Sequence, residues 1–120
     1  MAHPFVHVEL MSTDVGKAKS FYTGLFDWTL EDMPVNDMTY TMIKVGEGTG
    51  GGLMKNPMPG APSMWVPYVL VDDLDAATRK AQSLGATLLK DTTEVMSAGS
   101  FTLVTDPTGA ILGLWQCKKD

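Results

Sequence analysis

Cysteine, clustered positive charge and long apolar runs are scarce in this sequence, and each scarcity excludes a class of protein. The one cysteine, Cys117, cannot form a disulfide within the chain. Nine lysines and arginines stand against 14 aspartates and glutamates, and no basic cluster is longer than Lys118-Lys119, so the sequence lacks the positive surface that nucleic acids require. It also lacks an apolar run of about 18 residues and the pattern of a signal peptide. We therefore expect a cytoplasmic location, with neither nucleic acid nor membrane as a partner.

What is present is the composition of a folded protein. Apolar residues make up 44% of the chain and charged residues 19%, which is ordinary for a globular domain. The 120 residues suffice for one buried core but not for two independent ones. If the chain has two parts, they must therefore share one core. We expect a single domain over residues 1–120.

The first half of the sequence carries the pattern of a strand, a helix and three further strands. Residues 5–10 alternate between two faces, as in a half-buried strand, and Asp14 is a suitable N-cap for a helix that keeps helical apolar spacing to Leu25. A turn that carries Pro34, Asn36 and Asp37 is expected to separate the second strand from the third. The further expectations are strands at 28–33, 40–45 and 53–54 and a glycine-rich connection at 46–52.

The second half repeats the same order. Asp73 precedes a helix over 74–84 that Gly85 ends, and Asp106 opens a turn with the residue preferences of type I. A shift of 59 positions places Asp14 on Asp73, as a duplicated unit requires. The expected strands are 65–71, 87–91, 101–105 and 111–116. We expect a first module at 1–57, a proline-rich linker at 56–62 and a second module at 63–120.

Several short motifs occur in a specific order along the chain. They are the opening strand Phe5–Leu10, the helical segment Lys17–Tyr22, the strand-to-helix junction Val69–Ala76 and the hairpin Asp106–Gly109. This order resembles the vicinal-oxygen-chelate superfamily, which includes glyoxalases, bleomycin resistance proteins and extradiol dioxygenases. The resemblance implies an α+β fold in which two pseudo-repeated βαβββ modules form one cupped eight-stranded mixed sheet, with the helices outside.

The resemblance also indicates where metal ligands would stand. Metal enzymes of that superfamily place one ligand on the first strand and one on the last strand of each half, which here are His7, Met54, Val66 and Gly113. Valine and glycine offer no side-chain donor, and a thioether suits hard divalent ions poorly. Because a catalytic metal needs about three protein ligands, we predict a member that has lost most of its metal ligands and binds no metal or cofactor.

The face that carries His7 would line the cup. Strand alternation places Glu9 on that face and Val8 on the other. Glu9 has two interpretations: an acceptor or base within a pocket, or a carboxylate that lies at a wet rim or pairs with Lys44. The predicted ligand-binding residues are His7, Glu9, Met54, Tyr68 and Trp115. Such an apolar and aromatic lining with few polar groups suits a small molecule.

These observations leave more than one function open. We predict a protein that binds a small apolar or aromatic molecule in a metal-poor pocket, and that forms a homodimer because open sheet edges invite pairing. The alternative is a lyase, isomerase or dioxygenase that uses a non-standard metal site or acid-base chemistry by His7 and Glu9. The sequence names no catalytic residue and does not decide whether the chain is an enzyme.

Overall fold

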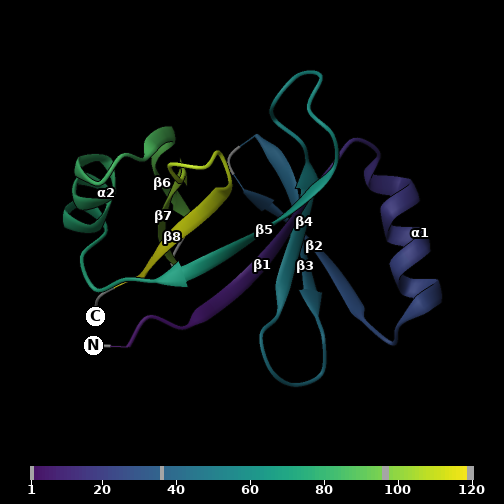
Figure 1. Ribbon diagram of the computed structural model, residues 1–120. Coiled ribbons are helices and arrows are strands. Elements are labelled where there is room, and N and C mark those ends of the chain that lie inside the picture. Colours follow the sequence, from purple (N-terminus) through teal and green to yellow (C-terminus); the bar gives the residue numbers. More distant parts are fainter. Residues whose placement is uncertain (1, 36, 96–97, 119–120) are drawn as a thin grey trace. The chain divides into compact units, whose positions relative to one another are not determined.

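The computed structural model describes residues 2–35, 37–95 and 98–118 and places two helices and eight strands in them (Figure 1). The elements in chain order are β1 (Phe5–Ser12), α1 (Val15–Leu25), β2 (Thr29–Val35), β3 (Met38–Lys44), β4 (Gly51–Lys55), β5 (Met64–Leu70), α2 (Leu74–Ser83), β6 (Thr87–Val95), β7 (Gly99–Thr105) and β8 (Ile111–Cys117). No helix in the described part of the chain has the length and apolar character needed to cross a membrane.

The strands form one mixed sheet in the order β2-β3-β4-β1-β5-β8-β7-β6. Strand β1 runs parallel to β4 and β5 runs parallel to β8, whereas the remaining registered pairs are antiparallel. Strand β5 begins 59 residues after β1, and α2 begins 59 residues after α1, as the sequence repeat predicts. The expected α+β class, with two βαβββ halves in an eight-stranded mixed sheet, is confirmed.

The chain forms two compact units. One is His7–Val66, the first-half unit; the other, the second-half unit, joins the residues up to Val6 with those from Pro67 onward. The N-terminal residues are tied to β5 within the second-half unit, because Pro4 O accepts the Leu70 N–H at 2.9 Å and His3 Nδ1–H donates to Leu70 O at 2.9 Å.

The first-half unit buries its apolar side chains between α1 and its sheet. Leu10, Ile43 and Leu53 are each at most 5% exposed, and Ala18 and Tyr22 of α1 pack on them. The helix begins at Val15 because the Asp14 side chain accepts the Lys17 N–H at 3.0 Å, which satisfies one of the free donors of the first turn.

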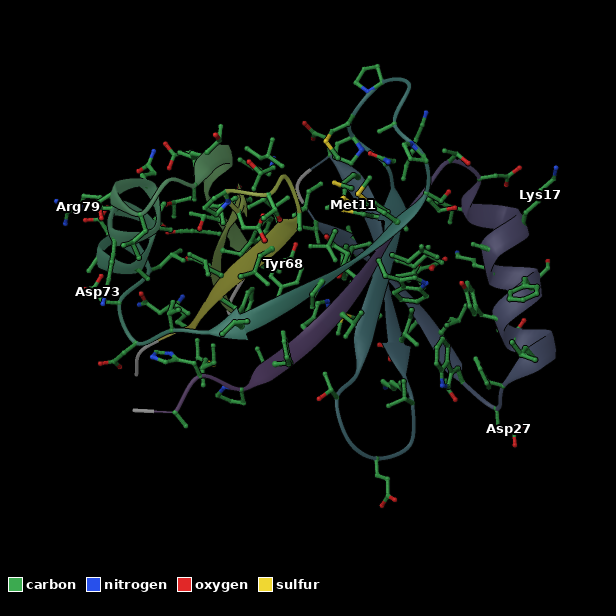
Figure 2. The ribbon with its side chains drawn as sticks, viewed as in Figure 1. Met11, Lys17, Asp27, Tyr68, Asp73 and Arg79 are labelled. Carbon is green, nitrogen blue, oxygen red and sulfur yellow. The ribbon has the colours of Figure 1, made fainter. Side chains whose placement is uncertain are left out.

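The second-half unit repeats this arrangement with α2 lying along β6, β7 and β8 (Figure 1). Asp73 caps α2 by accepting the Ala76 N–H at 3.1 Å (Figure 2). Beneath the helix, the Thr78 and Thr102 hydroxyls lie 3.0 Å apart, so two buried polar groups satisfy each other.

Several element boundaries differ from the sequence expectation, among them those of β2 and β6. Strand β2 continues through Pro34 to Val35, where a turn was expected; β2 is the terminal strand of the sheet, and an edge strand tolerates proline because one of its sides has no partner. Strand β6 extends beyond Asp91 to Val95, and register shifts within it disturb the alternation on which the sequence prediction depended.

Candidate functional site

Strand β1 presents different chemistry on its two faces. Leu10 lies in the core under α1, and Val8 shares that face by alternation. Glu9, which is 4% exposed, and Met11, which is 1% exposed, point to the opposite face, as does the half-buried His7. Each face of the first-half unit is therefore a separate candidate site.

The face that carries Glu9 holds a hydrogen-bonded cluster. His7 Nε2 lies 2.7 Å from the Tyr40 hydroxyl oxygen, and that hydroxyl is also hydrogen-bonded to the Glu9 carboxylate. Because a carboxylate only accepts, the single Tyr40 proton goes to Glu9, and His7 Nε2–H donates to the Tyr40 oxygen. We call His7, Tyr40 and Glu9 the polar cluster.

Burial sets the protonation states within the polar cluster. It lowers the pKa of the His7 imidazole, because the charged form loses hydration. Burial, followed by the negative charge of Glu9 and the hydrogen bond to it, raises the pKa of the Tyr40 hydroxyl far above its ordinary value. At neutral pH the cluster therefore holds a neutral imidazole and a protonated phenol beside the buried Glu9 side chain.

Tyr40 reaches β1 because the intervening strand has a glycine at the crossing point. Gly52 of β4 is the register partner of Glu9, and a Cβ on Gly52 would overlap the Tyr40 hydroxyl. The sequence pattern predicts that Gly52 lies in a glycine-rich connection and indicates no role for Tyr40. The structure instead includes Gly51 and Gly52 in β4, where a Cβ on Gly51 would overlap the Val8 carbonyl, so the glycines allow close strand approach.

Met54 shares a face with the polar cluster. It lies two residues after Gly52 on β4 and is the register partner of Met11 on β1. The structure thus brings three of the five predicted ligand-binding residues, His7, Glu9 and Met54, to one face of the first-half unit.

The other two predicted residues lie on one face of the second-half unit. Tyr68, 3% exposed, extends from β5 over Gly113 of β8 (Figure 2). Its ring packs edge-on against Phe101, with centroids 5.7 Å apart, and Phe101 is the register partner of the half-buried Trp115. Tyr68 and Trp115 therefore form part of an aromatic layer in that unit.

The structure excludes one of the two interpretations of Glu9. Lys44 Nζ lies 2.7 Å from Glu31 Oε2, and Glu9 itself is almost fully buried. The interpretation of Glu9 as a carboxylate at a wet rim or paired with Lys44 is therefore wrong, and the Tyr40 hydroxyl is hydrogen-bonded to Glu9.

The donor set does not fit the metal site of the superfamily that the sequence resembles. Val66 and Gly113 carry no donor atom, and the Tyr68 ring occupies the space over Gly113. Within residues 2–35, 37–95 and 98–118, no three histidine, cysteine, aspartate or glutamate side chains cluster as metal ligands would. We derive no chemical step through a metal ion.

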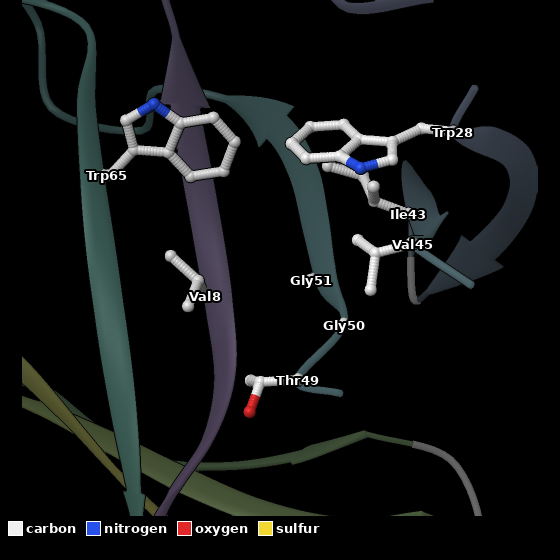
Figure 3. Close-up of a pocket in the computed structure, with 8 residues that line it drawn as sticks. All are labelled: Val8, Trp28, Ile43, Val45, Thr49, Gly50, Gly51 and Trp65. Carbon is white, nitrogen blue, oxygen red and sulfur yellow. The ribbon is translucent and has the colours of Figure 1, made fainter. Parts of the chain in front are cut away.

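The other face of β1 borders a cavity of about 270 Å³ (Figure 3). Its lining consists of Val8, Trp28, Ile43, Val45, Thr49, Gly50, Gly51 and Trp65. None of the five predicted ligand-binding residues lies among them. No periodic signal in the sequence announced this cavity, because its walls come from separate strands and loops.

The chain is similar to curated proteins that are longer than the chain itself. The chain is 36% identical over 118 residues to the Mycobacterium tuberculosis protein named "Putative glyoxylase CFP32" and 28% identical over 129 residues to "Anthracycline biosynthesis protein DnrV" of Streptomyces peucetius. These matches cover 93% and 90% of the chain but 45% of each relative. The chain therefore spans about half the length of the curated relatives it matches.

Comparison of structures and a family model agree on the fold. Methylmalonyl-CoA epimerase from Mycobacterium tuberculosis superposes with a TM-score of 0.71 over 96% of this chain and 88% of that one, at 17% identity, a level that shows the fold alone. The model of the Glyoxalase/Bleomycin resistance protein/Dioxygenase superfamily matches residues 5–114. Together with the eight-stranded sheet of two βαβββ halves, this match shows that the chain belongs to the glyoxalase/bleomycin resistance protein/dioxygenase superfamily.

Proposed function

We propose that this chain binds a small apolar or aromatic molecule, and that the polar cluster orients it. The observation that carries the proposal is the hydrogen-bonded path from His7 through Tyr40 to the buried Glu9, on a sheet face that also carries Met54. Small-molecule sites combine an apolar surface with a few fixed polar groups in this way. Tyr68 and Trp115 are the ligand contacts proposed for the second-half unit.

The chemistry of this face favours a ligand with an apolar body and one hydrogen-bonding group. His7 and Tyr40 are only half-buried, so the hydroxyl group of a ligand, which can donate as well as accept a hydrogen bond, can approach them from solvent. Met54 adapts its shape to an apolar body more readily than a branched side chain does. The name of the Streptomyces peucetius relative, which refers to anthracycline biosynthesis, supports an aromatic ligand.

Binding of 2-naphthol, measured as the change in the melting temperature of the protein, tests this proposal. We expect a saturable rise, and His7→Gln should weaken the apparent Kd about tenfold, as the loss of one oriented hydrogen bond would. Met54→Ala should weaken it as well, whereas Met38→Ala, at an exposed β3 methionine, is the matched control. Stabilisation by citrate but not by 2-naphthol would contradict an apolar or aromatic ligand.

We also propose that the chain forms a homodimer. Strands β2 and β6 end the strand order, and each therefore has a side without a partner strand in this sheet. Light scattering at micromolar concentration should give twice the chain mass of 13.0 kDa. A mass of one chain across the accessible concentration range would contradict the proposal.

Acid-base catalysis is a second candidate, and the Tyr40 hydroxyl favours it. When the neutral His7 ring accepts a proton, its Nε2 proton can pass to the Tyr40 oxygen. The Tyr40 proton then moves to Glu9. A lyase or isomerase activity of this kind should fall in both Tyr40→Phe and Glu9→Gln. Turnover that depends instead on a stoichiometric divalent metal lost in His7→Ala would support the non-standard metal site.

A further inference from the structure

The cavity on the other face of β1 has two indole rings as walls. Figure 3 shows Trp28 and Trp65 at one end, Thr49 at the other end and Val8 between the two ends. Trp65 is 38% exposed although the cavity floor beneath it is apolar. Large exposed aromatic side chains beside a concave apolar surface are typical of binding sites.

Both indoles are held in position by one tyrosine of α1. The Trp28 ring stacks on Tyr22, with centroids 5.7 Å apart and planes 19° apart, and Phe26 supports Trp28 at 4.7 Å. The Trp65 ring meets Tyr22 edge-on at 5.4 Å, and Trp65 Nε1–H donates to the Tyr22 hydroxyl at 3.3 Å. The walls are thus preorganised, which reduces the entropic cost of binding a rigid molecule.

The lining specifies the class of molecule. It contains no charged side chain, and Thr49 is the one residue in it with a hydroxyl. An apolar cavity of about 150 Å³ is known to hold benzene, and this cavity is larger, at about 270 Å³. We propose that the cavity between Trp28 and Trp65 is a second binding site, which takes an uncharged planar molecule of two fused rings.

This site is separate from the polar cluster. Val8 faces the cavity, whereas its neighbours His7 and Glu9 face the opposite side of the same strand. A molecule bound here contacts neither His7 nor Glu9. The proposal therefore stands or falls independently of ligand binding at the polar cluster.

Heteronuclear NMR with quinoline as the probe tests the proposal on the intact chain above neutral pH. We expect saturable shifts of the Trp28 and Trp65 indole N–H signals and of the Val8, Gly50 and Gly51 amides. Trp65→Leu removes one wall at a partly exposed position and should weaken the Kd about tenfold. Phe5→Leu, a change of an exposed aromatic residue outside the cavity, should leave the Kd unchanged.

A second variant covers the case in which Trp65→Leu changes the fold. Thr49 is exposed and lines the cavity, so Thr49→Phe should fill the space and abolish the quinoline shifts while the remaining spectrum is preserved. Quinoline shifts spread over the surface, or their absence up to the solubility limit, would overturn the proposal. It would also be overturned if the two indole signals shifted with protein concentration alone, because a second copy of the chain would then cover the cavity.

Discussion

At the scale of single residues, the Tyr40 hydroxyl has a structural role that a mutation can measure. It bridges His7 and the buried Glu9, so Tyr40→Phe removes a hydrogen-bond donor from a carboxylate that is 4% exposed. We expect urea unfolding to show a loss of about 1–3 kcal/mol, the usual cost of removing a partner from a buried polar group. The matched control is Tyr22→Phe, whose hydroxyl accepts a weaker bond of 3.3 Å from Trp65 and should cost less. Equal losses in the two variants would contradict the bridging role.

His7 makes a separate contribution to the pH dependence of stability. Burial lowers the pKa of His7 below its ordinary value of 6.5, so below that pH the unfolded chain binds a proton that the folded chain takes up only at lower pH. The contribution of neutral His7 to the free energy of unfolding should therefore be fully present above pH 6.5. It should be lost as the pH falls through the pKa of His7 in the folded chain. His7→Gln should remove this part of the decline in urea titrations at a series of pH values.

The acidic groups with lowered pKa values act in a different range and do not obscure this effect. Side-chain hydrogen bonds are the main cause of the lowered pKa values of Glu31, Asp32 and Asp106. Their contribution is lost only below about pH 5. A decline between neutral pH and pH 5 that is identical in the His7→Gln variant would show that another group causes it.

At the scale of elements, a tyrosine lies over a glycine of a neighbouring strand in each unit. Tyr40 lies over Gly52 in the first-half unit, and Tyr68 lies over Gly113 in the second-half unit. A Cβ on Gly113 would overlap the Tyr68 ring, so we expect Gly113→Ala to lower the free energy of unfolding by about 1–3 kcal/mol. Gly24→Ala is the control, because nothing lies within 4 Å of its added Cβ on α1, and alanine there should be neutral or stabilising.

A double-mutant cycle identifies the cause of that loss. If the overlap is responsible, Gly113→Ala should cost much less in a Tyr68→Leu background, because the ring that it displaces is gone. Costs that add independently would point to the backbone of β8 instead.

The helix starts provide a second prediction at this scale. Asp14 and Asp73 each accept a backbone N–H in the first turn of their helix, at 3.0 and 3.1 Å. Replacement of either by alanine should cost about 1 kcal/mol, and serine should restore most of it because serine also caps helices well. Circular dichroism during urea unfolding measures both effects. Serine variants no more stable than the alanine variants would argue against capping as the cause.

At the scale of the whole molecule, features encoded within a short segment were predictable and those made by distant segments were not. Asp14 and Asp73 announce their helices through local hydrogen-bond chemistry, and the 59-residue repeat carries the strand order of one half onto the other. Alternation along β1 correctly separates Glu9 from Val8. By contrast, the Tyr40 bridge depends on β4 lying between β3 and β1, and nothing in the local pattern fixes that neighbourhood. The cavity is invisible for the same reason, since Trp28 and Trp65 are far apart in the chain.

Hydrogen bonds between the N-terminal residues and β5 yield the last prediction. The residues before β1 belong with the second half of the chain, because Pro4 O accepts the Leu70 N–H and His3 Nδ1–H donates to Leu70 O, across 67 positions in the latter case. Deletion of residues 1–4 leaves the Leu70 N–H without this acceptor. Because the deletion also removes the His3 donor, we expect the free energy of unfolding to fall by about 2 kcal/mol, the net worth of two such hydrogen bonds. Amide hydrogen exchange should show Leu70 losing protection while Val71, which donates to Trp115 O at 2.8 Å, keeps it. Equal loss of protection at both amides would mean that the N-terminal residues stabilise β5 as a whole rather than this one bond.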